Sequence, residues 1–337
     1  MKILVTGGAG FIGSNFIRYM LSRYPHYKIV NLDKLTYAGN LDNLSDVEDN
    51  PNYQFIKGDI CDQNLVERTV EEKIDVIVNF AAESHVDRSI YDPKIFVQTN
   101  VLGTQVLLES ALKFKTEKFV QISTDEVYGT LTEGFFTESS LLLPNSPYSA
   151  SKASADLLVR SYFKTFGLPA VITRSTNNYG PYQFPEKLIP LFITNALSDQ
   201  NLPLYGDGLY VRDWLYVVDH CKALDLVLHE GKTGEIYNIS GNQEMTNLRI
   251  TELILKKLNK PKSLIKHVKD RPAHDRRYAL DSSKIKKELG WKPDASFEEG
   301  LSKTVEWYIA NEQWWQKVKT GEYLEYYQKH YVLRDSS

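Results

Sequence analysis

Residues 2–13, with the sequence KILVTGGAGFIG, carry an apolar run directly into a set of evenly spaced glycines. Ile3–Val5 is typical of a buried strand, and a helix is expected to begin after the glycines. Gly7, Gly10 and Gly13 fall between these elements, where glycine permits a tight bend and close approach of the backbone to a pyrophosphate. The free N–H groups at the start of the helix favour phosphates. The run therefore predicts a dinucleotide-binding turn, with an ordinary glycine turn as the alternative.

Asp33 follows the second apolar run, Lys28–Leu32, and lies 20 residues after Gly13. A carboxylate at this place can accept hydrogen bonds from the ribose hydroxyls of adenosine, and it would repel a 2′-phosphate. The sequence therefore predicts NAD rather than NADP as the cofactor. The positive charge of Lys34 weakens that preference slightly. A strand-end turn capped by Asp33 is the alternative interpretation.

Apolar runs alternate with segments that can form helices, as expected for a parallel sheet that is covered on both faces. The predicted strands are Ile3–Val5, Lys28–Leu32, Tyr53–Lys57, Val76–Phe80, Lys118–Ser123 and Ala170–Arg174. The fold class is therefore α/β, a Rossmann-type doubly wound parallel sheet with a smaller C-terminal substrate-binding domain. We expect residues 1–175 to form the NAD-binding domain, with residues 215–240 returning to it, and residues 176–337 to form mainly the substrate-binding domain.

The alternation becomes irregular after residue 175. Asn177–Pro185 is rich in Asn, Tyr, Gly and Pro, which predicts a structured loop. Further along, we expect a short strand followed by a helix over Leu215–Leu228, a strand at Ile236–Ile239, and helices at Asn247–Leu258 and Asp281–Leu289.

Tyr148 and Lys152 are four residues apart in PYSASK, residues 147–152. Pro147 suits the first turn of a helix, so both side chains are expected on one helical face. A tyrosine hydroxyl normally loses its proton at about pH 10, and a neighbouring ammonium and a positive nicotinamide ring both favour the phenolate. After a dinucleotide-binding turn, the pair predicts that Tyr148 removes a hydroxyl proton while a hydride leaves the same carbon. By itself the spacing is also typical of a helix surface.

Thr124, Asp125 and Glu126 follow the predicted strand Lys118–Ser123. Polar residues at the carboxyl end of a parallel strand lie where ligands bind in such sheets. Thr124 can hydrogen-bond a substrate oxygen. Two adjacent carboxyl groups in a partly dry site tend to hold different protonation states, which provides one acid and one base. The alternative is a solvated acidic turn.

The composition is that of an ordinary globular protein, with 42% hydrophobic and 25% charged residues. A formal net charge of -3 argues against a nucleic-acid partner. The two cysteines, Cys61 and Cys221, lack metal-ligand spacing, so we expect no metal site and a reducing compartment. No apolar run reaches membrane-spanning length, and the strand pattern that begins at Lys2 leaves no room for an export signal. We therefore expect a cytoplasmic protein without a membrane partner.

Together these motifs resemble the extended short-chain dehydrogenase/reductase family, and within it the NAD-dependent dehydratases of nucleotide sugars. The triplet Thr124-Asp125-Glu126 is the most diagnostic element, because 4-epimerases of the family share the glycine turn and the Tyr–Lys pair but resemble a triplet without the acid pair. Ala273 is a small departure, since glycine is often found there. The resemblance is carried by Gly7–Asn15, Leu32–Asn40, Ala81–Ser89, Ser123–Gly129, Tyr148–Ala153, Asn177–Pro190, Tyr205–Val217 and Asp270–Tyr278.

The resemblance implies two sets of binding residues. The NAD site would consist of Gly7, Gly10, Phe11, Ile12, Gly13, Asp33, Lys34, Leu35, Thr36, Asp59, Ile60, Ala81, Ala82, Thr99, Tyr148, Lys152 and Asn178. The nucleotide-sugar site would consist of Ser84, Thr124, Asn177, Lys187, Leu188, Pro203, Leu204, Tyr205, Arg212, Asn247, Asp270, Arg271 and His274. Charge agrees in part, because a diphosphate needs cations and the planar fork of arginine suits phosphate oxygens.

The resemblance also implies a reaction. The substrate dTDP-glucose would be oxidised at C4, lose water across C5 and C6, and regain the hydride at C6, which gives dTDP-4-keto-6-deoxyglucose. NAD would be regenerated in each turnover. Glu126 would remove the C5 proton and Asp125 would protonate the leaving 6-hydroxyl. The expected catalytic residues are Thr124, Asp125, Glu126, Tyr148 and Lys152.

Members of the family pair two helices per subunit in a four-helix interface, which implies a homodimer through segments near Pro93–Phe114 and Tyr148–Phe166. Three alternatives for the function stay open. The substrate could carry UDP or CDP, the enzyme could be a 4-epimerase, or the chain could be a non-catalytic NAD-binding regulator, since fold alone does not determine function.

Overall fold

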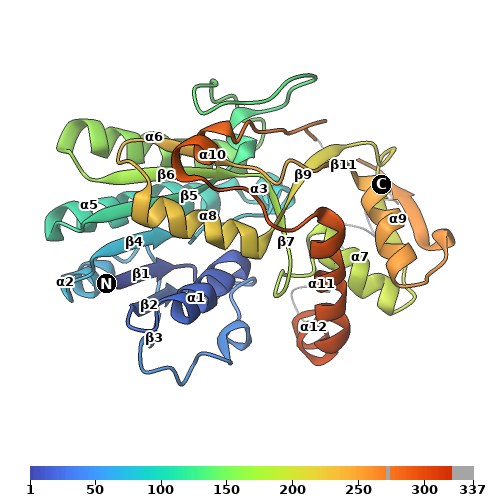
Figure 1. Ribbon diagram of the computed structural model, residues 1–337, viewed down its shortest axis with the longest axis horizontal. Helices are drawn as coiled ribbons and strands as arrows, with labels where there is room; N and C mark the ends of the chain where they lie inside the picture. Colours follow the sequence, from blue (N-terminus) through green and yellow to red (C-terminus); the bar gives the residue numbers. More distant parts are fainter. Residues whose placement is uncertain (271–273, 321–337) are drawn as a thin grey trace.

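The computed structural model describes residues 1–270 and 274–320. Seven strands from these residues form one parallel sheet, and Figure 1 shows helices in front of it and behind it. In the order of the sheet, the strands are β10 (Ile236–Ile239), β6 (Ala170–Ser175), β5 (Lys118–Thr124), β4 (Val76–Asn79), β1 (Lys2–Thr6), β2 (Lys28–Asp33) and β3 (Tyr53–Lys57). This is the doubly wound α/β arrangement that the sequence predicts.

Apolar side chains fill the space between the sheet and its two helix layers. Phe16 and Ile17 pack with Val217 and Leu224 on one face, and Leu107 packs within the core of the other face. Because both faces are covered, the central strands carry apolar residues at consecutive positions, as in Ile3–Val5 and Val76–Val78, instead of alternating regularly with polar residues. The helices on the first face are α1 (Phe11–Arg23), α8 (Val217–Glu230) and α10 (Ser283–Leu289), and those on the second are α2 (Gln63–Glu71), α5 (Thr104–Phe114) and α6 (Pro147–Phe166).

The helix α6 begins and ends at clear sequence signals. Pro147 occupies the first turn, where its missing N–H is not needed. Ser146 caps the helix, because its hydroxyl accepts from the N–H of Ser149 while the Ser149 hydroxyl accepts from the N–H of Ser146. Gly167 ends the helix in the left-handed conformation, with φ of 70°. These signals place Tyr148 and Lys152 in the first two turns.

A second core lies beside the carboxyl ends of the sheet strands. Three helices, α7 (Leu188–Leu197), α9 (Asn247–Lys257) and α11 (Phe297–Ala310), pack around buried side chains such as Phe192, Ile254 and Leu301. Figure 1 shows this smaller part to one side of the main sheet. Its other elements are α12 (Glu312–Val318), a three-stranded sheet of β11 (Glu244–Thr246), β9 (Val211–Tyr216) and β7 (Asn177–Tyr179), and a pair formed by β12 (Ile265–Val268) and β8 (Leu202–Tyr205).

Short helices complete the chain near the sheet. A continuous helical segment runs from α4 (Pro93–Phe96) through the π-helix η2 (Val97–Gly103) into α5, because the residues at both junctions keep helical backbone angles. The remaining short elements are α3 (Val86–Tyr91) and the 3₁₀ helices η1 (Leu41–Leu44), η3 (Asp125–Tyr128) and η4 (Lys262–Leu264). In the part of the chain that the structure describes, no helix combines the length and apolarity needed to cross a membrane.

The strands predicted in the first half of the chain are confirmed, and each end differs by at most one residue. Two predictions for the second half were partly wrong. The loop predicted at Asn177–Pro185 begins with β7, because Asn177–Tyr179 pairs with β9. The strand predicted to start at Leu215 begins at Val211, where it pairs with β7 and β11. These pairings join segments that are distant in sequence, so local patterns do not reveal them.

The expected strand at Ile236–Ile239 is confirmed, and it pairs with β6 at the edge of the main sheet. The helix expected at Asn247–Leu258 is observed as α9. The helix expected from Asp281 begins two residues later, because the Asp281 carboxylate accepts from the N–H of Ser283. With α8 and β10 packed on the main sheet, the chain returns to it after β9. The proposed division into two domains at residue 175 remains a prediction.

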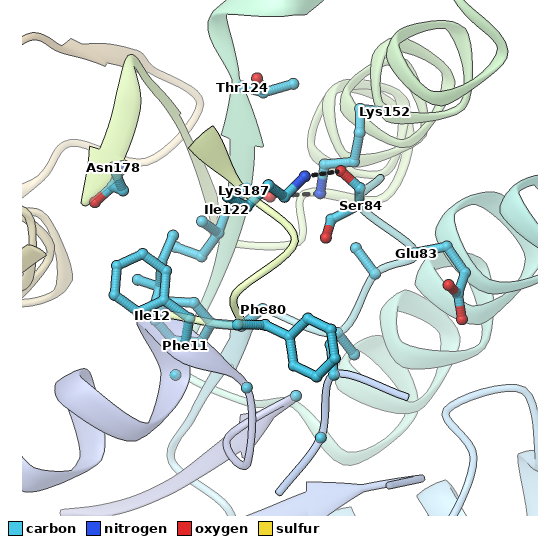
Figure 2. Close-up of a pocket in the computed structure, with 18 of the residues that line it drawn as sticks. Phe11, Ile12, Phe80, Glu83, Ser84, Ile122, Thr124, Lys152, Asn178 and Lys187 are labelled. Atoms are coloured by element: carbon cyan, nitrogen blue, oxygen red, sulfur yellow. Dashed lines mark hydrogen bonds between the residues drawn. The ribbon is translucent and has the colours of Figure 1, made fainter. Parts of the chain in front are cut away.

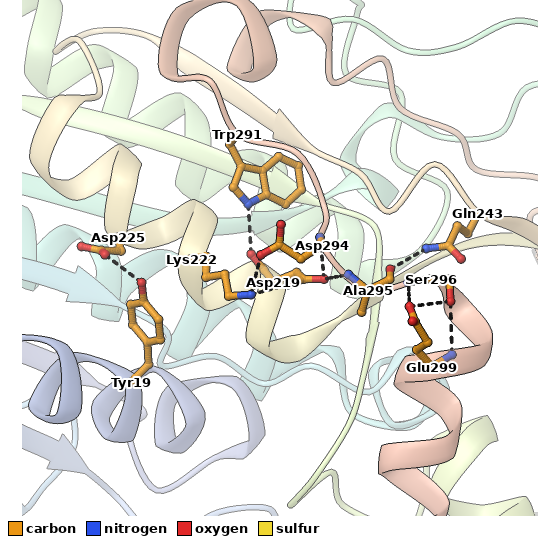
Figure 3. Close-up of polar contacts among 10 residues, drawn as sticks. All are labelled: Tyr19, Asp219, Lys222, Asp225, Gln243, Trp291, Asp294, Ala295, Ser296 and Glu299. Carbon is orange, nitrogen blue, oxygen red and sulfur yellow. Dashed lines mark hydrogen bonds and ion pairs between the residues drawn. The ribbon is translucent and has the colours of Figure 1, made fainter.

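Asp219 in the first turn of α8 connects the main sheet layer to the segment before α11, as Figure 3 shows. Its buried carboxylate accepts hydrogen bonds from the backbone N–H groups of Asp294 (3.1 Å) and Ala295 (2.9 Å). Lys222 reaches the other carboxylate oxygen at 3.0 Å, and the Trp291 indole donates to the backbone carbonyl of Asp219 at 3.2 Å. The Asp219 side chain thus provides the hydrogen-bond acceptor for two backbone N–H groups of the segment before α11.

We predict that Asp219→Asn lowers the free energy of unfolding by about 2 kcal/mol, because the amide loses the charge and cannot accept with both side-chain termini. Asp294→Asn is the matched control: Asp294 also pairs with Lys222, at 2.7 Å, but its side chain is exposed. The control should cost less than about 1 kcal/mol. Urea unfolding of both variants measures the difference, and equal costs would contradict the role given to Asp219.

Candidate active site

A cavity opens at the carboxyl ends of the parallel strands, beside the point between β1 and β4 where the strand order reverses. Doubly wound sheets bind their ligands at this point. The cavity volume is about 360 Å³, which is in the range of small-molecule sites. Figure 2 shows Phe11, Ile12 and Phe80 near one end of the cavity, and Thr124 and Lys152 near the other.

The glycine turn approaches neighbouring backbone so closely that a side chain would not fit. Gly7 has φ of 70°, and a Cβ on it would lie 2.6 Å from the backbone nitrogen of Ala81, which follows β4. A Cβ on Gly13 would lie 2.4 Å from the carbonyl oxygen of Gly7. The turn is therefore compact and leaves the first residues of α1 open toward the cavity. This cradle fits a dinucleotide pyrophosphate.

Asp33 lies at the end of β2 and is largely buried. Its carboxylate accepts from the backbone N–H of Ala9 at 2.9 Å and of Leu35 at 2.8 Å. Burial raises the pKa of Asp33, and these two hydrogen bonds oppose the shift. Lys34 pairs with Asp59 at 2.7 Å, so its charge is partly neutralised by a neighbouring carboxylate. The arrangement keeps an anionic oxygen at the place where an adenosine ribose would lie.

The residues that we predicted for the NAD site line the cavity, with one exception. Leu35 has φ of 57° and is absent from the described lining; its backbone N–H holds Asp33 instead. The cavity also contains polar groups suited to a ligand. Asn177 Oδ1 and Asp125 Oδ2 are buried and have no hydrogen-bond partner among the described residues. Buried polar atoms of this kind normally have partners, so both are available to a bound molecule.

Tyr148 and Lys152 lie on the same face of α6 and line the cavity. The Lys152 ammonium is buried and donates to the carbonyl oxygen of Ile122 at 2.6 Å. Burial lowers the pKa of Lys152 to about 8, and the Asp156 carboxylate opposes the shift. Burial therefore brings the pKa of Lys152 closer to neutral pH.

The surroundings of Tyr148 within the chain itself oppose the phenolate. Burial and the negative charge of Glu126 raise the pKa of Tyr148. The ammonium that was expected to favour the phenolate is hydrogen-bonded to Ile122 instead. The predicted activation of Tyr148 also involves a positive nicotinamide ring, so it remains a prediction. The spacing of the pair on one helix face is confirmed.

Thr124 ends β5, and Asp125 and Glu126 begin η3, so the triplet enters the cavity where the strand stops. The Thr124 hydroxyl accepts from the N–H of Glu126 at 3.3 Å and donates to Asp125 at 3.2 Å. Asp125 is 2% exposed; burial and the charge of Glu126 raise the pKa of Asp125 well above its usual range. The pair thus contains one carboxyl group that favours the protonated state, as an acid requires.

The predicted nucleotide-sugar residues separate into two groups. Ser84, Thr124, Asn177, Lys187 and Leu188 line the cavity. The Lys187 ammonium donates to the backbone carbonyl of Ser84 at 3.1 Å, and Figure 2 shows this bond as a dashed line. The residues outside the described lining are Pro203, Leu204, Tyr205, Arg212, Asn247, Asp270 and His274, and Arg271 lies outside the described residues.

The second group clusters beyond the cavity around Tyr210. His274 stacks on the ring of Tyr210, with ring centroids 3.8 Å apart, and accepts or donates a 2.7 Å hydrogen bond with Asp270. Arg212 is buried and donates to backbone carbonyls, including that of Asp275 at 2.8 Å. The Tyr205 hydroxyl donates to Asp87 at 3.3 Å. Their predicted contact with the nucleotide remains a prediction.

Sequence reasoning missed several lining residues. Some could have been found, because Ser123, Ser175 and Thr176 lie at the carboxyl ends of β5 and β6, where polar residues indicate a site. Others lie in segments whose position depends on the whole fold, and no local pattern identifies them. These are Glu83, Gln183, Phe184 and Glu186 in loops, and Trp214 on β9. Among the residues that the structure describes, no group of three or more His, Cys, Asp and Glu side chains could hold a metal ion.

The sheet, the glycine turn and the Tyr148–Lys152 pair define a dehydrogenase/reductase of the extended short-chain class. The family model for GDP-mannose 4,6 dehydratase matches residues 4–304, and the chain belongs to this family. The dTDP-glucose 4,6-dehydratase of Streptomyces niveus is 53% identical over 324 residues, which cover 95% of this chain and 96% of that protein. The low-salt glycan biosynthesis protein Agl12 of Haloferax volcanii is 55% identical and covers 93% of this chain and 100% of its own.

A solved structure is similar throughout. The crystal structure of DesIV, a dTDP-glucose 4,6-dehydratase from Streptomyces venezuelae with NAD and TYD bound, has a TM-score of 0.93 and 52% sequence identity. The match covers 95% of this chain and 100% of DesIV. The similarity therefore extends over both the main sheet and the smaller core.

We predict that Gly7→Ala weakens dinucleotide binding on the order of tenfold, equivalent to about 1.4 kcal/mol, because the turn must move away from Ala81. Gly167→Ala is the matched control: Gly167 also has φ of 70°, but no described atom lies within 4 Å of its added Cβ. Both variants should lose roughly 1 kcal/mol of stability from the left-handed backbone. Calorimetric titration with dinucleotide separates the two, and unchanged affinity in Gly7→Ala would refute the cradle.

Proposed function

We propose that this protein is a dTDP-glucose 4,6-dehydratase, which converts dTDP-glucose to dTDP-4-keto-6-deoxyglucose and water with NAD as a tightly bound cofactor that is regenerated in each turnover. The observation that carries the proposal is the content of one cavity. Tyr148 and Lys152 suit an oxidation and its reversal, and Asp125 and Glu126 suit an elimination. An enzyme that only oxidised or epimerised C4 would need the first pair alone.

NAD, when bound, accepts the hydride from C4 of the sugar and returns it to C6. The chain supplies the environment: Gly7, Gly10 and Gly13 suit the pyrophosphate, and Asp33 suits the adenosine ribose. Lys152 and Tyr148 would then lie near the nicotinamide end, where Figure 2 shows Lys152 across the cavity from Phe11 and Ile12. Asp33 would favour NAD because its carboxylate repels a 2′-phosphate.

In the oxidation, Tyr148 would remove the proton of the sugar 4-hydroxyl. The chain alone keeps the Tyr148 hydroxyl protonated, because burial and Glu126 raise its pKa. A cationic ring beside the phenol would favour the phenolate, and the Lys152 ammonium would add to this effect. Thr124, at the end of β5, would hydrogen-bond the same sugar oxygen. The reaction thus depends on charges that meet only in the loaded site.

In the elimination, Glu126 would remove the proton from C5, which the adjacent 4-ketone makes acidic. Asp125 would protonate the 6-hydroxyl, which then leaves as water. The raised pKa of Asp125 supports this assignment, because burial and the neighbouring Glu126 charge both favour its protonated form. Asp125 and Glu126 are adjacent in the chain, so their effects on the rate should be strongly non-additive.

The assignment of the nucleotide part of the substrate is based on the names of similar proteins. Proteins about 50% identical over nearly the whole chain carry the name dTDP-glucose 4,6-dehydratase. Most of the residues predicted for the nucleotide-sugar site lie outside the described cavity lining, so UDP- and CDP-linked sugars are the alternatives to test. An assay for release of water from the sugar also distinguishes a 4-epimerase, which would release none.

An isotope experiment tests the function directly. Because the cofactor stays bound, dTDP-glucose deuterated at C4 should give a product deuterated at C6 within the same molecule. Ordinary substrate in heavy water should acquire deuterium at C5, because a proton on Glu126 exchanges with solvent. Mass spectrometry and NMR locate the label. Return of the label to C4 would show an epimerase, and its appearance on free reduced cofactor would show a simple dehydrogenase.

We predict that Glu126→Gln separates oxidation from elimination, because the amide keeps the shape but cannot take the C5 proton. The variant should accumulate reduced cofactor and form product at least on the order of a hundredfold more slowly. Tyr148→Phe is the matched comparison: the ring remains but the ionisable oxygen is lost. Stopped-flow absorbance should show almost no reduced cofactor in Tyr148→Phe. A normal rate of water loss in Glu126→Gln would exclude Glu126 as the base.

We also propose that the protein is a cytoplasmic homodimer. Val97 and Leu102 on the helical segment of residues 93–114, and Leu157 on the adjacent α6, expose large apolar side chains, with Val97 57% exposed. Exposed apolar side chains on neighbouring helices suit burial against a second copy in a four-helix interface. Both cysteines are free, which suits a reducing compartment.

We predict that the double variant Val97→Glu with Leu157→Glu is monomeric, because burying two unpaired carboxylates at the interface would oppose association. Leu141→Glu is the matched control, since Leu141 is also highly exposed but lies in the loop before α6. Sedimentation velocity should give a dimer for the unmodified protein and the control. A monomeric unmodified protein, or a dimeric double variant, would contradict the proposed interface.

A further inference from the structure

A buried ion pair lies beneath the cavity, outside the groups assigned to the reaction. Asp156 on α6 is 1% exposed, and Arg174 on β6 is 3% exposed. Arg174 Nε donates to Asp156 Oδ2 at 2.8 Å. Removing two charges from water is costly, and an apolar pair of similar volume often stabilises a fold as well or better. The pair therefore calls for an explanation other than stability.

On one side, the pair contacts the helix that carries the oxidation groups. Tyr148, Lys152 and Asp156 follow one another at four-residue spacing, so they share one face of α6. The Asp156 carboxylate is the charge that opposes the effect of burial on the pKa of Lys152. Asp156 in turn is held by the guanidinium of Arg174.

On the other side, the pair contacts the turn that carries the elimination groups. Arg174 Nη1 donates to the Tyr128 hydroxyl at 2.8 Å, and this hydroxyl donates to Asn238 Oδ1 on β10 at 2.9 Å. Tyr128 is the last residue of η3, two residues after Glu126. A four-residue 3₁₀ turn has few hydrogen bonds of its own. The bond to Arg174 thus fixes η3 relative to the sheet.

We propose that Arg174 is a positioning residue that holds Asp156 on α6 and Tyr128 on η3 at once, and so keeps the Tyr148–Lys152 pair in a fixed arrangement with the Asp125–Glu126 pair. The inference rests on the proposed function. The planar guanidinium suits this task because its separate N–H groups point in fixed directions, which a lysine ammonium does not reproduce. The buried charge then serves the geometry and protonation of the site.

The groups that face this corner of the site come from three elements. They are Tyr148, Lys152 and Asp156 on α6, Asp125, Glu126 and Tyr128 on η3, and Arg174 on β6. Lys152 is an ammonium below its pKa and a neutral amine above it. Removing the Asp156 charge leaves Arg174 unopposed, which favours the neutral amine. The midpoint of the Lys152 titration should therefore move to lower pH.

Tyr128→Phe removes the bonds of the η3 hydroxyl to Arg174 and Asn238 and leaves the Arg174–Asp156 pair in place. The ring keeps its stacking on Phe136, with centroids 5.0 Å apart, and only the hydroxyl is lost. Stopped-flow absorbance with dTDP-glucose should show reduced cofactor appearing at nearly the unmodified rate. Its disappearance should slow on the order of tenfold, because small displacements of catalytic groups have effects of this size or larger.

Asp156→Asn cuts the α6 side. The pH at which NAD affinity changes, measured by calorimetry, should fall on the order of one pH unit, and the alkaline limit of the first oxidation should fall with it. Tyr128→Phe should leave this midpoint unchanged. Tyr19→Phe is the matched control, since the Tyr19 hydroxyl donates to the Asp225 carboxylate at 3.0 Å on the α1–α8 side, as Figure 3 shows. The control should lose stability without changing either phase or the midpoint.

Parallel slowing of both phases in Tyr128→Phe, or no slowing in either, would overturn the proposal, as would an unshifted midpoint in Asp156→Asn. If Asp156→Asn does not fold, Tyr128→Phe decides by the separation of the two phases. If the unmodified protein forms no 4-keto product, the proposed function fails. The NAD-binding midpoint still tests the Arg174–Asp156 contact in that case, because it requires no substrate turnover.

Discussion

The contact between the turn after β1 and the backbone after β4 is the constraint on which the site depends. Gly7 lies against Ala81 with no room for a side chain, so two neighbouring parallel strands end at one compact point. The connections from these strands lead to opposite faces of the sheet, which opens the crevice above them. Thr6 and Asn79, the last residues of the two strands, join by a 2.6 Å hydrogen bond directly below the turn.

Around this crevice the protein places ionisable groups where water is scarce. Lys152 and Asp125 are buried, and burial shifts the pKa of each toward its neutral form. Burial therefore favours the protonated form of the Asp125 carboxyl group and the neutral form of the Lys152 amine before any ligand arrives. A ligand charge entering such a medium has a much larger effect than it would in water. In this medium the charge of Lys152 is stabilised by a buried partner, Asp156, and not by solvent.

Much of the fold and the dinucleotide side of the site could be predicted, because each signal lies within a few residues of sequence. The spacing of Gly7, Gly10 and Gly13 describes one turn, and Tyr148 and Lys152 describe one helix face. The pairing of Asn177–Tyr179 with β9 could not be predicted, because it joins residues far apart in the chain. The same reason hides Glu186 and Trp214, which reach the cavity only after the two cores pack. The burial of Tyr148 and its effect on the pKa of that residue could not be predicted either, because burial is a property of the folded chain.

The place of β10 in the sheet has a consequence for how the chain acquires its structure. This edge strand pairs with β6, but the chain between them first forms β7, α7, β8, β9 and α8. Closing such a long loop is an entropic cost that must be met before the pairing contributes stability. We therefore expect this pairing to form later than the pairings between strands that are close in sequence. A nascent chain released before residue 240 would lack β10 and expose the open edge of β6. Folding of the segment between β6 and β10 brings β10 to this edge and so removes a site of aggregation.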